Sequence, residues 1–171
     1  MQRTIVTEAR PARLTVRDLG LGAFAGLCGG LAMGIVSLLI AFAKGISIWT
    51  PLQEIAGVFS TRLSAGAAGF QFVPVLTGTV VHFALSALLG VLFAAVYRGV
   101  LDLPSTLGFP LVYGFIFGVL IWFISDQALN GGLISATDYT PEFVAQHLVF
   151  GSVTGLVFGM LRPARAYLPR D

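Results

Sequence analysis

The sequence predicts an all-α membrane protein with four transmembrane helices, and two observations carry this prediction. Hydrophobic residues make up 56% of the 171-residue chain and charged residues only 11%, whereas an average soluble domain carries roughly 25% charged residues. Four stretches also reach or approach the about 20 apolar residues that a helix needs to cross the hydrocarbon core. An isolated strand cannot satisfy its backbone in lipid, so each stretch is expected to be a helix. We therefore expect a single transmembrane domain over residues 1–171.

The first two spans are predicted at residues 19–43 and 74–97. The first contains no charged residue. Residues 41–43 resemble a signal-peptidase site, but the apolar run of about 25 residues exceeds the 7–15 that are usual in a signal peptide, so we expect the span to be retained. The second span contains His82 as its only ionisable group before Tyr97 at its end.

The last two spans are predicted at residues 107–125 and 141–161. The third span is uncharged and is followed directly by Asp126. The fourth has Glu142 at its start, where a helix dipole favours an acid, and His147 inside. The short connections between spans two and three and between spans three and four leave little chain for a separate domain.

Lys and Arg are distributed unevenly between the two sides of the predicted bundle. One side carries Arg3, Arg10, Arg13, Arg17, Arg98, Arg162, Arg165 and Arg170, and the other side carries Lys44 and Arg62. The positive-inside rule therefore predicts that both termini lie in the cytoplasm. The outer loop 44–73 contains residues 51–63, which are compatible with a short interfacial helix, a re-entrant segment or a plain connection.

Spans two and four share a pattern that indicates an internal repeat. Starting from His82 and from His147, each has a small residue four positions on, Gly eight positions on and Phe eleven positions on. Spans one and three share a weaker pattern, in which Gly30 and Gly34 match Gly114 and Gly118. The predicted architecture is two helical hairpins in a parallel repeat, with an axis along the membrane normal.

Glycines at intervals of four residues predict close helix packing on two of the spans. Repeated small residues let helix backbones approach, because lipid gives helices no hydrophobic reason to associate. We expect this packing inside the bundle, with a homo-oligomer or a larger membrane complex as the alternative. The predicted packing residues are Gly22, Gly26, Gly30, Gly34, Gly114, Gly118, Gly151, Gly155 and Gly159.

The two histidines are the candidate functional residues, because ionisable groups at membrane depth usually face the protein interior. His82 and His147 should lie at the same depth on parallel helices. Three interpretations stay open. Each ring could bond across the bundle and fix helix register; the pair could supply both axial ligands of a haem b; or the pair could form a proton-responsive or solute-handling site.

Other kinds of chemistry lack a sequence signal. The chain contains no Walker loop, no dinucleotide-binding fingerprint, no HExxH and no GxSxG motif, so we expect no enzyme. Cys28 is the only cysteine and no compact ligand spacing predicts a metal site. The formal net charge of +2 and the absence of a nucleic-acid motif argue against nucleic acid as a partner, which leaves the lipid bilayer.

The later half of the chain resembles the YagU-like bacterial inner-membrane proteins and related four-helix families. The resemblance rests on Val81-His82-Phe83, Gly114, Glu142-Phe143 and Gln146-His147-Leu148-Val149, within residues 75–160. It implies a small multi-pass inner-membrane protein with a link to acid tolerance.

Taken together, these patterns predict a non-enzymatic multi-pass protein, an accessory subunit or a small stress-related membrane factor. The alternatives are a haem-binding electron-transfer subunit that uses His82 and His147, and a small-solute channel or transporter. No carboxylate or lysine lies in the middle of a span, and this disfavours an ion-coupled transporter.

Overall fold

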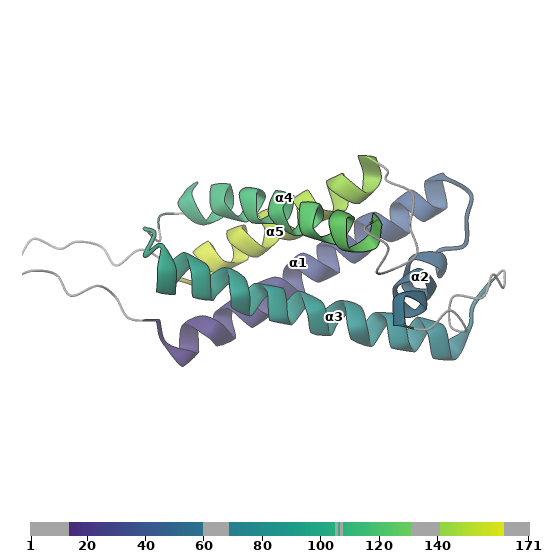
Figure 1. Ribbon diagram of the computed structural model, residues 1–171, viewed down its shortest axis with the longest axis horizontal. Coiled ribbons are helices and arrows are strands. Elements are labelled where there is room, and N and C mark those ends of the chain that lie inside the picture. The colour runs from purple at the N-terminus through teal and green to yellow at the C-terminus, as the bar shows by residue number, and fades with distance from the viewer. Residues whose placement is uncertain (1–13, 60–68, 105, 107, 131–140, 163–171) are drawn as a thin grey trace, which may run out of the picture.

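The computed structural model describes residues 14–59, 69–104, 106, 108–130 and 141–162. Over these residues the regular structure is helical throughout, without a strand. The helices are α1 Val16–Ala43, α2 Thr50–Phe59, α3 Phe72–Ala94, the π-helix η1 Ala95–Val100, α4 Gly108–Asn130 and α5 Pro141–Leu161 (Figure 1). Four described segments are long and apolar enough to cross a membrane, namely α1, α3 with η1, α4 and α5. The all-α prediction with four such helices is confirmed.

Helix α1 begins at Val16, before the predicted residue 19, because a capping box starts it. The Thr15 hydroxyl accepts a hydrogen bond from the Asp18 backbone N–H at 3.2 Å, and the Asp18 carboxylate accepts one from the Thr15 backbone N–H at 2.9 Å. This reciprocal arrangement satisfies donors that the first helical turn leaves unpaired. Hydropathy marks where an apolar run begins, whereas the cap marks where the helix begins.

Two further helices extend beyond their predicted ends. Helix α3 continues into η1, which ends at Val100 rather than at residue 97. The wider turn of a π-helix lets the consecutive residues Tyr97 and Arg98 both be buried. Helix α4 continues to Asn130 rather than ending at residue 125. A polar residue such as Asp126 ends an apolar run without interrupting the backbone hydrogen bonds of a helix.

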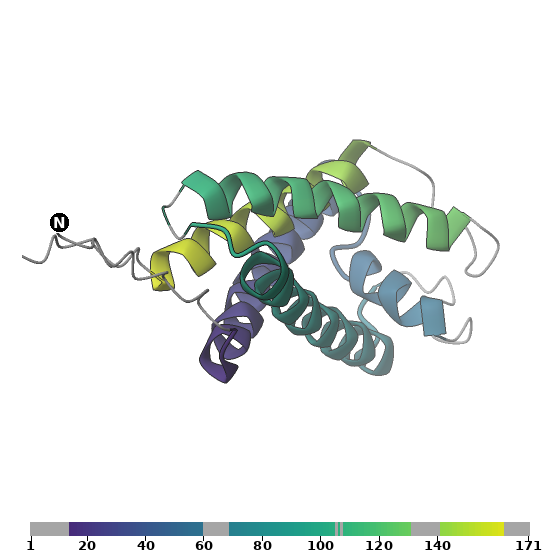
Figure 2. The same ribbon diagram turned by 60° about the vertical axis from the view of Figure 1, so that its left-hand side comes forward.

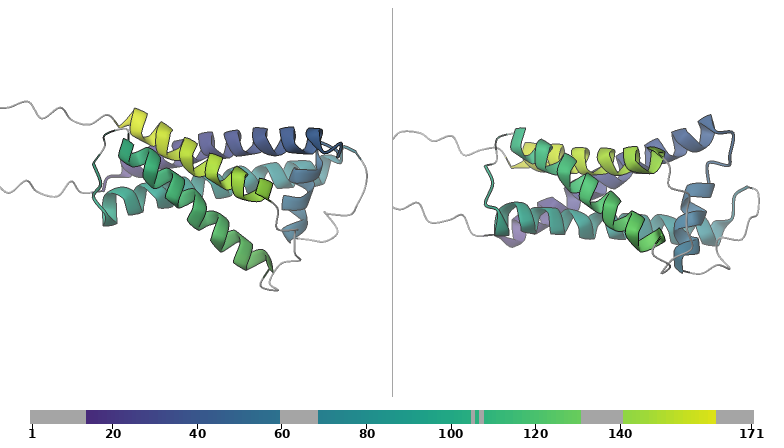
Figure 3. Two further views of the ribbon diagram at one scale, coloured as in Figure 1. Left: turned by 90° about the horizontal axis from the view of Figure 1, so that it is seen from above. Right: turned by 45° about the horizontal axis from the view of Figure 1, so that its top comes forward.

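The fourth span is found at its predicted limits, and the outer stretch 51–63 contains the short helix α2. The positions after residue 59 in that stretch lie outside the described residues. Helix α2 lies across the end of the bundle, steeply inclined to α3 (Figure 3). It packs on α3 where Gly78 leaves room for the Leu52 carbonyl. The Gln53 side-chain amide also donates to the Gly69 carbonyl at 2.8 Å.

The long helices form two antiparallel pairs that meet through α1. Helix α1 packs on α3 and on α5, and α5 packs on α4 (Figures 1 and 2). We call the end at which α1 and α4 begin the terminal end, because the first described helix starts there and the last one ends there (Figure 1). The opposite end is called the α2 end.

Backbone contact through glycine holds both pairs together. In the α1–α3 pair, a methyl group on Gly26 would collide with the Ser86 carbonyl, and one on Gly90 with the Gly22 carbonyl. In the α4–α5 pair, methyl groups on Gly114 and Gly151 would each collide with the backbone of the other residue. The predicted packing glycines Gly22, Gly26, Gly114, Gly118, Gly151 and Gly155 all make such contacts across their pair, whereas Gly30 meets the Ser86 side chain and Gly159 is buried.

The contacts favour a different register for the weaker half of the sequence repeat. Gly30 lies against His82 and Ser86 of α3, and Gly118 lies against His147 of α5. The positions equivalent to Gly114 and Gly118 are therefore Gly26 and Gly30, one helical turn earlier than the pairing predicted from the sequence. Gly34 lies beyond this contact, beside the His82 ring. The duplication itself stays a prediction.

Aromatic side chains fill the space between α3, α4 and α5 toward the terminal end. The aromatic cluster consists of Phe93, Tyr97, Tyr113, Phe117 and Phe158. Their ring centroids lie 5.0 to 6.2 Å apart, mostly in tilted or edge-to-face arrangements, which aromatic quadrupoles favour. The cluster joins α3 and η1 to α4 and α5, and four of its five side chains are buried.

Candidate ligand-binding cavity

A cavity of about 770 Å³ lies at the α2 end, between α1, α2, α3 and α5. Pockets for small molecules typically measure roughly 300–1,000 Å³. The cavity exists because α1 and α3 touch closely only as far as Gly30 and diverge toward the α2 end (Figure 1). Helix α2 closes the wedge only in part.

The walls are mostly apolar, with polar groups at a few positions. The apolar side chains include Leu31, Ile35 and Leu38 of α1 and Leu52, Ile55 and Val58 of α2. The polar side chains are Ser37, Lys44, Glu54, Thr79, His82, Glu142 and Gln146. Most of these polar groups belong to α2, to the end of α1 or to the start of α5, so they gather at the outer part of the cavity.

His82 lines the cavity and bonds across the helix pair. Its Nε2 lies 2.9 Å from the Gly30 carbonyl oxygen of α1. A carbonyl oxygen only accepts, so Nε2 carries the hydrogen and donates it. The bond lies at the point where the two helices separate. The structure therefore gives His82 the cross-helix bond that the first of the three sequence interpretations expects.

His147 lies deeper in the bundle and bonds within its own helix. Its Nδ1 donates to the Phe143 carbonyl at 2.8 Å, and its ring packs edge-on against the Phe143 ring. The side chain is only 6% exposed and does not line the cavity. Phe150, one turn after His147 on α5, lies against Gly29 of α1, and His82 lies beside the neighbouring Gly30. The two histidines therefore lie at a similar level along α1.

The two histidines as they lie do not fit the paired axial ligands of a haem. The Gly30 carbonyl already occupies Nε2 of His82. A porphyrin would also have to separate α1 from α3 next to their backbone contact, and α4 from α5 where Gly118 lies on the His147 carbonyl. Among the described residues, no group of three or more His, Cys, Asp or Glu side chains could hold a metal ion.

An ion pair joins two walls of the cavity. Lys44 Nζ lies 2.9 Å from Glu142 Oε1, and both side chains are partly exposed. Lys44 caps the end of α1 and Glu142 lies in the first turn of α5. Each charge has the sign that its helix terminus favours. The pair therefore links the ends of the two helices and neutralises both charges.

Glu54 is the remaining carboxylate of the cavity. It comes from α2, outside the membrane-crossing segments, and has no ion-pair or hydrogen-bond partner among the described residues. The apolar surroundings raise the pKa of Glu54 above its usual value, because they disfavour the charged form. With Lys44 and Glu142 paired, an ionised Glu54 gives the described lining residues of the cavity one negative charge in excess.

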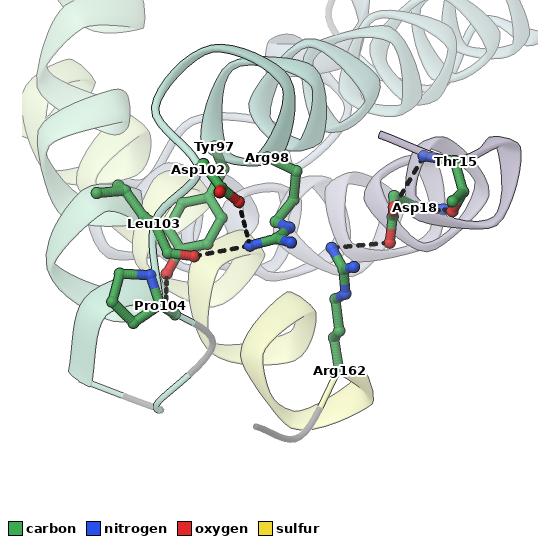
Figure 4. A network of polar contacts seen from close by, with 8 residues as sticks. All are labelled: Thr15, Asp18, Tyr97, Arg98, Asp102, Leu103, Pro104 and Arg162. Atoms are coloured by element: carbon green, nitrogen blue, oxygen red, sulfur yellow. Dashed lines mark hydrogen bonds and ion pairs between the residues drawn. The ribbon is translucent and has the colours of Figure 1, made fainter. Parts of the chain in front are cut away.

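A second group of charges lies at the terminal end and includes Arg98 and Arg162. Asp18 is 3% exposed, and its carboxylate forms an ion pair with Arg162, with 2.8 Å between Oδ1 and the guanidinium nitrogen (Figure 4). This contact ties the start of α1 to the end of α5. The spacing of Thr15 and Asp18 is a recognisable capping signal, but nothing local in the sequence pairs residue 18 with residue 162.

Arg98 forms the other half of this group. It is 8% exposed, lies 3.0 Å from the Asp102 carboxylate and donates to the Leu103 carbonyl at 2.9 Å. The neighbouring Tyr97 hydroxyl donates to the Pro104 carbonyl (Figure 4). These bonds fix the turn after η1, so the arginines here stabilise the connection to α4 in addition to marking a side of the membrane.

The sequence patterns did not predict the cavity itself. One feature of the sequence is consistent with open space there. Gly34 continues the four-residue glycine spacing of α1 past Gly30, where the close contact with α3 ends. Comparisons with known proteins gave no match to a protein-family model, to a curated protein or to a solved structure. The function is therefore argued from the geometry of this cavity.

Proposed function

We propose that this chain is a non-enzymatic multi-pass protein of the bacterial cytoplasmic membrane that binds a small amphiphilic molecule in the cavity at the α2 end. The observation that carries the proposal is the cavity, with its apolar walls and its polar groups gathered at the outer part. Such a site suits a molecule with an apolar body and a polar head. Ligand binding of this kind is compatible with an accessory subunit or a stress-related membrane factor.

The distribution of charge supports an orientation with both termini in the cytoplasm. Arg17, Arg98 and Arg162 all belong to helix ends at the terminal end, whereas Lys44 belongs to the α2 end. A C-terminal reporter that is active only outside the cytoplasm should therefore give no signal. A strong signal from that reporter would reverse the proposed topology.

The aromatic cluster supports binding in preference to passage of a solute. Phe93, Tyr97 and Phe158 are at most 1% exposed and fill the space between the helices on the terminal side. The cavity wall residues come from the α2 half of the long helices. A site with one open end retains a ligand, whereas a channel needs a path to both sides.

Photolabelling tests this function directly. A single-chain amphiphile with a neutral sugar head and a diazirine in its chain is added to the full-length protein in lipid nanodiscs, and labelled positions are mapped by peptide mass spectrometry. We expect saturable labelling of Leu52 and Ile55, which face the cavity from α2. Gly34→Leu should abolish that labelling, because a side chain at Gly34 would enter the cavity without meeting the backbone of another helix.

Gly20→Leu on the same helix is the matched control. A side chain at Gly20 meets open space and lies outside the cavity, so labelling should be unchanged. Labelling of α2 that does not saturate, or that survives Gly34→Leu, would show contact with bulk lipid only and would contradict the proposal.

A further inference from the structure

We infer that the occupant of the cavity is a membrane phospholipid with a primary amine in its headgroup, held by one acyl chain in the cavity and by its amine at Glu54. This inference rests on the proposed function and names the class of ligand. It draws on three observations, which concern where the cavity opens, what closes its other sides and which charge it leaves unmatched.

The cavity opens sideways, toward the lipid. Leu31, Ile35 and Leu38 line it and are also 54%, 51% and 36% exposed on the outer surface of α1. The same side chains therefore belong to the cavity wall and to the apolar surface that faces acyl chains. A ligand that is already in the bilayer can enter along this wall without crossing a polar surface.

Specific contacts join the elements on two other sides of the cavity. Helix α2 is fixed to α3 where Gly78 faces the Leu52 carbonyl, and Gln53 bonds to the Gly69 carbonyl. The Lys44–Glu142 ion pair connects α1 to α5. Among the described residues, these contacts favour entry of an acyl chain through the gap beside α1, with its headgroup at the level of α2.

The charge at that level selects the headgroup. Lys44 and Glu142 neutralise one another, and His82 donates to Gly30, so Glu54 is the carboxylate available to a ligand. Glu54 is exposed beside apolar neighbours at the edge of the cavity, and a carboxylate in such a place is stabilised by a cationic donor. A primary amine supplies both a charge and N–H donors. A quaternary amine supplies only the charge, and an anionic headgroup would be repelled.

Native mass spectrometry of the full chain can test this. The protein is released from nanodiscs that contain equal amounts of phosphatidylethanolamine, phosphatidylcholine and phosphatidylglycerol, and the retained lipids are counted. We expect a several-fold enrichment of phosphatidylethanolamine over its share of the nanodisc. Glu54→Gln should remove the enrichment. Asp126→Asn, which removes a carboxylate at the same end but outside the cavity, should preserve it.

Each other outcome contradicts the inference. Equal retention of the ethanolamine and choline lipids would show an acyl site without amine recognition, and enrichment of the glycerol lipid would assign recognition to Lys44. Lipid retention that is unchanged in Gly34→Leu would place the lipids elsewhere on the surface. If the neutral photoprobe labels the cavity in all of these cases, the proposed function stands and only the amine lipid is excluded.

Discussion

The two glycine-lined helix pairs share one spacing of small residues and differ in what their histidines bind. In the α1–α3 pair, His82 donates to Gly30 of the other helix, whereas in the α4–α5 pair His147 donates to Phe143 of its own helix. The α4–α5 pair is still in backbone contact at its histidine, because Gly118 lies on the His147 carbonyl. The α1–α3 pair opens at that level and holds the cavity. A repeated pattern thus determines which faces meet, but not how a ring bonds.

The largest difference in stability between the two helix pairs is expected for substitutions at the equivalent positions 86 and 151. Gly151→Ala places a methyl group against the Gly114 carbonyl, so the helices must separate. Overpacking of this kind costs about 1–3 kcal/mol. Ser86 already carries a side chain, and its hydroxyl bonds only to the His82 carbonyl of the same helix. Ser86→Ala should therefore change the unfolding midpoint in detergent little, and equal effects of the two substitutions would break the comparison.

A smaller effect, on photolabelling of the cavity, is expected at α2, the short helix that packs on the α1–α3 pair. Gly78→Ala should displace α2 from α3, because the methyl group would collide with the Leu52 carbonyl. The four long helices should stay folded, while photolabelling of α2 inside the cavity decreases. Gly20→Ala serves as the control, since its methyl group meets open space. Unchanged labelling in Gly78→Ala would mean that α2 does not need this contact.

Exchanging each histidine for phenylalanine sharpens the comparison further. His82→Phe removes the only bond that a histidine makes between the described helices, and membrane hydrogen bonds of this type contribute about 0.6 kcal/mol on average. His147→Phe removes a bond within one helix and should alter the distance between the helices less. Spin labels on α1 and α3 would report a wider distance distribution in His82→Phe alone. A matching change in both variants would show that the two bonds are equivalent.

The smallest expected effect is a dependence of stability on pH that arises at Glu54. Its pKa is raised in the folded protein because apolar surroundings disfavour the charge. The folded state therefore gains stability below the ordinary pKa and loses it as the pH rises through the raised value. Lys44, Glu142 and His82 also face the cavity, but the wild type and a Glu54→Gln variant both contain them, so their titration does not distinguish the two. Glu54→Gln should thus be more stable than the wild type at neutral pH, with no advantage in acid.

The sequence predicted the helices well because an apolar run of transmembrane length leaves the backbone few alternatives. The limits of α5 agree with the prediction, and those of α1 and α4 differ because Thr15 and Asp126 act on the ends of a helix rather than on its hydropathy. The glycine contacts were predictable from spacing alone. The different bonds of His82 and His147 were not, because they depend on how far apart each pair lies at that depth.

The cavity could not be predicted from the sequence for a related reason. It results from the divergence of α1 and α3, which no local pattern records, and from the position of α2 across them (Figure 2). The contact between Asp18 and Arg162 likewise joins residues from opposite ends of the chain. Such features follow from tertiary geometry, whereas spans and packing faces follow from periodicity.

The aromatic cluster has an electrical consequence for the proposed location in an energised cytoplasmic membrane. Moving one elementary charge through 100 mV is worth about 2.3 kcal/mol, so any wet path between the two sides would dissipate the ion gradient. The closely packed rings of Phe93, Tyr97 and Phe158 form an insulating layer below the cavity. The voltage should drop mainly across this layer. Glu54 would then remain at the potential of the α2 side, and the proposed ligand could bind and leave without the membrane losing charge.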